Sequence, residues 1–313
     1  MTRRILIDLL LGGTAGSLAC TRPNAGILSR FQRLIRANDL IMLDALVPEA
    51  ITVIGAGDWR LVLPEPPGRL SFSPDGAWIA WFPYSNVYER ASGGLSVCFT
   101  NSAQSARRIK LEGRHGAALA VSSGAERLAV CMAVAAGPVS RLVVIKVATG
   151  EIQDDVSDLI SRFDLRTTER MRLSASGDRL VVGSPSHFSL IDLPSRKLVL
   201  EGEGRFPCIS PSGEALAYVD GRRELSLTTV ATGTTKRLLE HSITHGVGSW
   251  TPDGELLFAG VEGPLSFFPY LSVVDCIGDG CATIARLEEH DGGQECGLIK
   301  RRLLTPGAHR ASV

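Results

Sequence analysis

The sequence predicts an all-β protein: a β-propeller of about six four-stranded blades, preceded by a short N-terminal helical segment. A turn motif recurs along the chain, and each copy runs into a stretch of apolar residues typical of a buried strand. In addition, 33 glycines and 16 prolines among 313 residues, with a charged fraction of 21%, indicate a chain that turns often between half-buried strands.

The repeat sets the architecture. Three strong copies occupy residues 70–81, 206–218 and 247–258, and two weaker copies occupy residues 119–130 and 171–182. One Ser/Thr position aligns all five copies, and it is held by Ser73, Ser122, Ser174, Ser210 and Thr251. Measured at that position, the copies start 49, 52, 36 and 41 residues apart, which brackets the roughly 40 to 50 residues of a propeller blade. A single hairpin cannot bury both of its faces, whereas several stacked around an axis can.

Each strong copy is predicted to contain a tight turn. Proline at the first turn position fixes φ, Asp or Ser can bond the nearby backbone, and glycine takes a conformation with positive φ. The residues assigned to these structural turns are Pro74, Asp75, Gly76, Pro211, Gly213, Pro252, Asp253 and Gly254. Ala125 occupies the glycine position in the second copy, so we expect that turn to be built differently.

The second half of each blade is also legible, because apolar runs such as residues 95–99, 142–147 and 225–230 lead into polar turns and a further strand. Residues 51–63 and 298–304 are expected to form a sixth blade by pairing the two ends of the domain. Such closure removes the exposed edges of an open sheet. The propeller domain is therefore assigned to residues 50–313.

At its Ser-Pro-Asp-Gly turns the chain resembles the TolB-like and WD-repeat-like propellers, over roughly residues 50–305. No Trp-Asp dipeptide or Gly-His pair ends the strands, which departs from true WD repeats and favours the TolB-like, bacterial branch. The resemblance implies protein binding with no cofactor.

Residues 1–20 are predicted to be an export signal. Arg3 and Arg4 precede apolar residues, and small residues then lead to Cys20, a candidate for lipidation and a membrane tether. Asp8 inside the apolar stretch and Ser17 in the cleavage box depart from the pattern, so the alternative is a cytoplasmic protein whose first strand or helix lies here. Export places the protein in the periplasm or cell envelope.

Residues 21–49 are assigned to an N-terminal helical segment. Ile27, Phe31, Leu34 and Ile35 follow a helical period with arginines between them. This amphipathic face is expected to pack on the propeller; the alternative is that it lies on a membrane surface.

With Cys20 set aside as a lipid anchor, six cysteines remain, and this even number favours an oxidising compartment. Cys276 and Cys281 flank a glycine-containing turn and are expected to form a hairpin disulfide. A metal site is the alternative, but no second Cys pair or neighbouring His completes four ligands. Cys131 and Cys208 lie in apolar patterns and are interpreted as buried small hydrophobes.

Charge excludes some partners. The 33 Lys+Arg balance 33 Asp+Glu, so we expect no nucleic-acid binding. No apolar run reaches the roughly 20 residues of a membrane-spanning helix.

The sequence yields no catalytic, metal-binding or cofactor-binding residues, because none of the common nucleotide, zinc-protease or hydrolase motifs occurs. His241 and His245 stand four apart, but this spacing converges on a helix, and the stretch precedes a strand. Asp75 and Asp253 recur in the turn motif and are interpreted as turn residues rather than as an acid/base pair. Trp78, Trp81 and Trp250 are expected in the core or along the central channel.

The densest aromatic group, Phe267, Phe268 and Tyr270, is the candidate partner-binding surface. The predicted function is a non-enzymatic scaffold that binds a protein or peptide. The alternative is a propeller-fold hydrolase or lyase with its site at the channel mouth, which would gather several titratable groups there.

Overall fold

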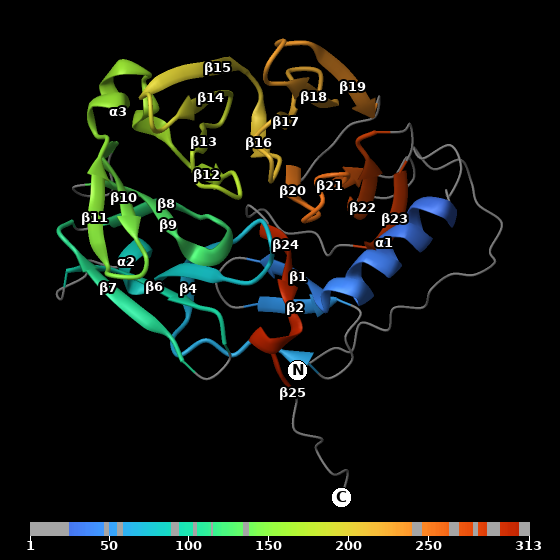
Figure 1. The fold of residues 1–313 in the computed structure, drawn as a ribbon, viewed down its shortest axis with the longest axis horizontal. Helices are drawn as coiled ribbons and strands as arrows, with labels where there is room; N and C mark the ends of the chain where they lie inside the picture. The colour runs from blue at the N-terminus through green and yellow to red at the C-terminus, as the bar shows by residue number, and fades with distance from the viewer. Residues whose placement is uncertain are drawn as a thin grey trace, which may run out of the picture.

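The computed structural model describes residues 25–46, 50–54, 59–88, 94–102, 105–113, 115–133, 138–239, 246–262, 269–277, 281–286 and 295–306. These residues form antiparallel sheets arranged around a common centre, with few helices (Figure 1). The predicted all-β propeller class is confirmed.

Five of the described sheets have four strands each, and we number these blades in chain order. The first contains β4 (Pro67–Phe72), β5 (Ile79–Pro83), β6 (Leu95–Thr100) and β7 (Arg107–Leu111); the second β8 (His115–Val121), β9 (Arg127–Ala133), β10 (Val139–Lys146) and β11 (Glu151–Asp155). The third contains β12 (Arg170–Leu173), β13 (Arg179–Gly183), β14 (His187–Asp192) and β15 (Lys197–Glu203); the fourth β16 (Arg205–Ile209), β17 (Ala215–Val219), β18 (Leu225–Thr229) and β19 (Thr235–Leu239); the fifth β20 (Gly246–Trp250), β21 (Leu256–Glu262), β22 (Pro269–Asp275) and β23 (Cys281–Arg286).

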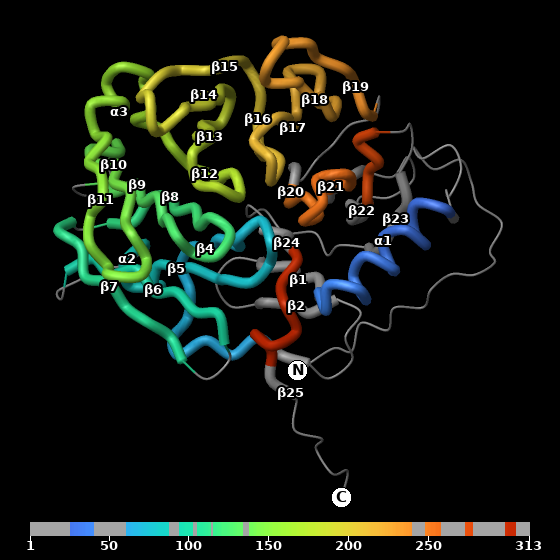
Figure 2. The backbone as a smooth tube through the Cα atoms, in the orientation of Figure 1, coloured from blue at the N-terminus to red at the C-terminus, as the bar shows by residue number. Residues whose placement is uncertain are grey.

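The two ends of the domain meet in a sixth sheet. Its three strands are β24 (Glu295–Lys300), β1 (Leu40–Leu46) and β2 (Ala50–Ile54), in that order. Close by, β3 (Trp59–Arg60) pairs with β25 (Thr305–Pro306). The first strands of neighbouring blades contact one another from β4 through β8, β12, β16 and β20, and β24 contacts both β20 and β4 (Figure 2). Strand β24 therefore closes the ring, with the N-terminal strands β1 and β2 outside it.

The helical segment is shorter than predicted. Helix α1 spans Ala25–Asn38, and Asp39 follows in the left-handed region at φ +51°. Residues 40–46, predicted to be helical, form β1 instead, since β1 pairs on both sides, with β2 and with β24. Tertiary pairing has overridden the local pattern here.

Helix α1 packs on the fifth and sixth sheets. Ile27 and Phe31 are buried against Leu256, Val273 and Leu298, and Arg30 forms an ion pair with Asp275 at 3.1 Å. The apolar face of the helix is thus covered by the propeller, as expected, and not left for a membrane surface. In the part of the chain that the structure describes, no helix is long and apolar enough to cross a membrane.

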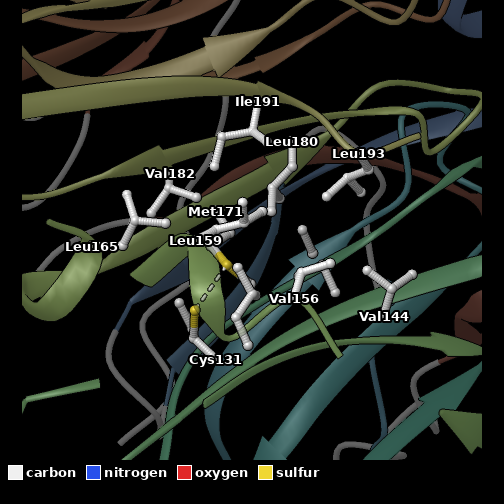
Figure 3. Packing of buried hydrophobic residues seen from close by; sticks show 14 of the residues in the cluster. Cys131, Val144, Val156, Leu159, Leu165, Met171, Leu180, Val182, Ile191 and Leu193 are labelled. Carbon is white, nitrogen blue, oxygen red and sulfur yellow. Dashed lines mark hydrogen bonds between the residues drawn. The ribbon is translucent and has the colours of Figure 1, made fainter. Parts of the chain in front are cut away.

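The core lies between neighbouring sheets. Strand β5 is buried at all five positions, because it packs against another sheet on each face. Figure 3 shows the cluster between the second and third blades, where Cys131 and Met171 meet with their sulfur atoms 3.3 Å apart. The remaining described helical elements are short turns: α2 (Ser85–Tyr88), α3 (Asp158–Arg162), η1 (Ser123–Ala125), η2 (Leu165–Thr167) and η3 (Arg301–Leu303).

Candidate functional site

The repeated turns join the first and second strands of the five four-stranded blades. Gly76, Gly213 and Gly254 have φ of +67°, +79° and +72°, and Gly177 in the third blade has φ of +75°. In each turn the glycine N–H donates to the carbonyl of the Ser/Thr residue three positions earlier, for example from Gly254 to Thr251 at 2.8 Å. The turns are therefore built alike.

A buried hydroxyl fixes each turn from inside. The five aligned Ser/Thr residues are at most 3% exposed. In every copy the hydroxyl oxygen accepts the backbone N–H five residues later, at 2.9 to 3.1 Å: Trp78 to Ser73, Arg127 to Ser122, Arg179 to Ser174, Ala215 to Ser210, and Leu256 to Thr251. The repeat predicted that this position matters, but its role as an internal acceptor came from the structure. The signal in the sequence was the recurrence of a hydroxyl in all five copies.

The predicted turn carboxylates are engaged in the same network. The Asp75 carboxylate accepts hydrogen bonds from the Ser73 hydroxyl and the Ala77 N–H, and Asp253 accepts equivalent bonds from Thr251 and Glu255. Asp75 also accepts a 3.4 Å bond from the Gly124 N–H of the next blade. These contacts are what a turn residue makes, and they leave no pairing between the two aspartates.

We expected the turn of the second copy to be built differently from the others. The residue at its glycine position nevertheless has positive φ as well. Ala125 has φ of +50°, and its N–H donates to the Ser122 carbonyl at 3.2 Å, as the glycines do. The adjacent Gly124 is also left-handed, at φ +67°, so the turn carries one extra unusual residue. The expectation was wrong for Ala125, because the buried Ser122 hydroxyl and the flanking strands dictate the backbone there.

Backbone hydrogen bonds link neighbouring turns. The Ser123 N–H donates to the Ala175 carbonyl at 3.1 Å, and the Ala175 N–H donates to the Pro211 carbonyl at 2.8 Å. The series stops at Pro211 because proline has no N–H. This end of the ring is thus held across the second, third and fourth blades by main-chain contacts.

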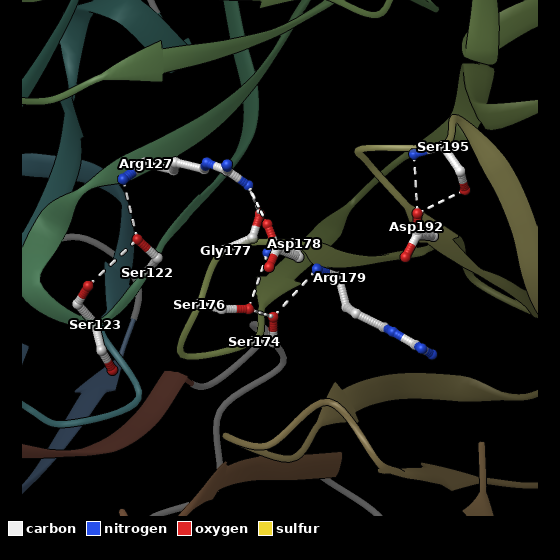
Figure 4. Close-up of polar contacts among 10 residues, drawn as sticks. All are labelled: Ser122, Ser123, Arg127, Ser174, Ser176, Gly177, Asp178, Arg179, Asp192 and Ser195. Carbon is white, nitrogen blue, oxygen red and sulfur yellow. Dashed lines mark hydrogen bonds and ion pairs between the residues drawn. The ribbon is translucent and has the colours of Figure 1, made fainter. Parts of the chain in front are cut away.

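Arg127 and Arg179 occupy equivalent positions after the turns but behave differently (Figure 4). The Arg127 guanidinium bonds Asp178 and the Gly177 carbonyl of the next blade. Arg179 packs its methylene groups near Gly213, and its Nη1 atom is buried with no hydrogen-bond partner. Of these two contacts between neighbouring blades in the described part of the chain, the one made by Arg127 includes an ion pair and the one made by Arg179 does not.

At the other end of the inner strands lies a group that sequence reasoning missed. Phe206, at φ +55°, is bracketed by two guanidinium groups, with Arg170 Cζ 4.6 Å and Arg205 Cζ 5.4 Å from the ring centroid. A positive φ is unusual for a bulky residue. The positive φ of Phe206 coincides with an irregularity in the pairing of β16 with β17. No local sequence pattern predicts this irregularity.

The aspartates whose pKa values are shifted serve local structure. Hydrogen bonds from the Ser195 hydroxyl and N–H hold the pKa of Asp192 below its usual range. Burial acts to raise the pKa of Asp155, but hydrogen bonds from Ser157 and Arg141 outweigh it and lower the pKa.

The thiols are buried rather than activated. Burial raises the pKa values of Cys98, Cys131 and Cys276 to about 12. Cys276 is a free thiol here, which differs from the expected disulfide with Cys281. The hairpin register explains this: Cys281 pairs with Val274, while Cys276 packs in a core cluster with Cys208 and Trp250.

Two of the tryptophans, Trp81 and Trp250, belong to the core. Trp81 is fully buried, and Trp250 donates its indole N–H to the Cys208 carbonyl at 3.0 Å. Of the candidate partner-binding residues, Tyr270 lies in β22, and Phe267 and Phe268 lie outside the described residues. Cys20, His241 and His245 also lie outside them. Among the described residues, no three His, Cys, Asp or Glu side chains are grouped to hold a metal ion.

Comparison with known proteins identifies the fold. No protein-family model and no curated protein matches the chain. The structure of TolB from Acinetobacter baumannii matches with a TM-score of 0.54 and 14% identity, over 82% of this chain and 66% of that one. Kuenenia stuttgartiensis hydrazine synthase matches at 0.47 and 18% identity, over 72% and 68% of the two chains. The Myceliophteria thermophila Cps50 (Swd1) β-propeller domain matches at 0.45 and 13%, over 75% and 90%. The match to TolB shows that the chain has a TolB-like propeller fold.

Proposed function

We propose that the chain is a non-enzymatic scaffold that binds a protein or peptide partner in the cell envelope. The observation that carries the proposal is a closed ring of sheets in which the aspartates and thiols with shifted pKa values, among the described residues, are used for structure. Asp155 and Asp192 fix local turns, and three thiols with raised pKa values lie in the core. Perturbed groups at a catalytic site would instead converge on one cleft.

The rigidity of the ring supports the same role. Loops held by a fixed framework are where binding residues concentrate. Here the framework is fixed by buried hydroxyls and by main-chain bonds between blades. The ring can therefore hold the ends of its loops at fixed positions, which lowers the entropy cost of binding a partner.

The partner surface is proposed to include Phe267, Phe268 and Tyr270. Changing all three to Ser should abolish co-purification of a stoichiometric partner from the native envelope fraction, because aromatic anchors dominate binding energy. Ile152→Ser is the matched control, since Ile152 is an exposed apolar residue on β11. A partner equally retained by both variants would refute the aromatic surface, and no stoichiometric partner for the wild type would refute the scaffold.

Export is proposed from the order of residues 1–20, with lipid on Cys20 as the tether. Mass spectrometry of protein from the native host should find residues 1–19 removed and Cys20 modified. An intact Met1 in the cytoplasmic fraction would contradict both the location and the tether.

A further inference from the structure

The outer strands of the five four-stranded blades carry charged residues. These are Arg107, Arg108 and Lys110 on β7; Glu151, Asp154 and Asp155 on β11; Lys197, Glu201 and Glu203 on β15; Lys236 and Arg237 on β19; and Arg286 on β23. Charges on an edge strand discourage pairing with another chain, because a partner strand would have to approach and desolvate them.

The sixth sheet ends differently. Its outer strand β2 (Ala50–Ile54) reads Ala-Ile-Thr-Val-Ile, with no charged residue and four β-branched residues. The next described strand, β3, contacts β2, but it pairs with β25 and not with β2. Within the described ranges, no strand fills the position that a fourth strand fills in the other blades. An uncharged β-branched edge of this kind is a template for a further strand.

We propose that β2 pairs with the β2 strand of a second copy of this chain, which joins two three-stranded sheets into one of six strands. Antiparallel pairing about a two-fold axis would set Thr52 opposite itself and Ile51 opposite Val53, with no charge in the contact. The same pairing of β7 would set Arg108 opposite Lys110, and that of β11 would set Glu151 opposite Asp155. Like charges oppose pairing at those two edges, whereas β2 is self-complementary. This self-association does not depend on the proposed binding of another protein.

Sedimentation equilibrium on the full chain tests the proposal. At about 100 µM, well above the micromolar dissociation constants of modest interfaces, the wild type should show twice the 33.4 kDa chain mass. Thr52→Lys and Thr52→Glu should each be monomeric, since each sets like charges opposite one another. An equimolar mixture of the two variants should recover the dimer mass. Gln153→Lys, at the centre of β11, is the control and should leave the mass unchanged.

A monomeric wild type at this concentration would overturn the proposal, and so would a Thr52→Lys variant that stays dimeric. If the mixture stays monomeric while both variants melt like the wild type, the edge is not the contact. Should a variant fail to fold, hydrogen exchange on the wild type decides: protection of the β2 amides must rise with protein concentration, and protection that stays constant refutes the pairing.

Discussion

The first and fifth blades carry the same turn in different surroundings. In both, a buried hydroxyl accepts a backbone N–H and a glycine takes positive φ. Around Gly254 there is space: a Cβ added there would meet nothing nearer than Pro211 Cδ at 3.6 Å. Around Gly76 the chain is closed, because an added Cβ would lie 2.6 Å from the Leu298 carbonyl oxygen and 3.0 Å from Leu40 Cδ2.

The difference shows where the ring is joined. Gly76 also accepts the Lys300 N–H at 2.7 Å, so the first turn holds the last strand of the propeller in place. Glycine is favoured at position 254 only because the backbone has positive φ there. At position 76 the backbone also has positive φ, and in addition there is no room for a Cβ atom. The same turn motif therefore forms a hairpin in the fifth blade, and in the first blade it also contacts the strand that closes the ring.

Replacing these two glycines should produce unequal losses. Gly76→Ala should lower the free energy of unfolding by about 2 to 5 kcal/mol, since left-handed strain adds to overpacking against a backbone oxygen. Gly254→Ala should cost about 1 kcal/mol, from the positive φ alone. Urea denaturation of both variants beside the wild type measures the difference. Equal losses would mean that the closing strand does not pack against the first turn.

Removing the hydroxyls should, in contrast, produce equal losses. Ser73→Ala and Thr251→Val each leave a buried backbone N–H without its acceptor, at Trp78 and at Leu256. Each should cost about 1 to 3 kcal/mol, the usual penalty for an unsatisfied buried donor. The same denaturation experiment checks this, with Thr232→Val in an exposed turn as a control near zero. A Ser73 loss well above that of Thr251 would mean that the hydroxyl also serves ring closure.

Much of the propeller could be predicted from the sequence because the strands of each four-stranded blade lie close together along the chain. A hairpin places its strands within a dozen residues, so Pro, Gly and apolar runs are sufficient signals. The sixth sheet is different, since β1 pairs with β24, whose residues lie 250 to 260 positions later along the chain. The apolar spacing that predicted a helix through residues 40–46 carries no information about that distant partner.

The candidate site shows the same limit. The recurring turn residues could be identified in the sequence. The ion pair between Arg127 and Asp178 and the strained backbone of Phe206 could not, because they depend on contacts between blades. The Cys276–Cys281 expectation rested on spacing, whereas the observed thiol position is set by the register of β22 and β23. The sequence of a glycine-containing turn does not reveal whether the two strands pair in one register or in a register shifted by two residues.

The smallest effect is expected at Ala125, and it separates two explanations of that turn. Ala125 is 3% exposed and packs in the core between the first and second blades, yet its φ is +50°. Ala125→Gly should relieve about 1 kcal/mol of left-handed strain and lose about 0.8 kcal/mol of methyl burial. The net change in unfolding free energy should therefore stay within about 0.5 kcal/mol, by cancellation rather than because the backbone is relaxed. Ala125→Ser tests the surroundings of the methyl group: it keeps the backbone conformation and adds a hydroxyl to an apolar site, so it should destabilise by about 1 to 3 kcal/mol. If Ala125→Gly instead stabilises by more than about 1 kcal/mol, the methyl contributes little to the core and the turn is strained without compensation.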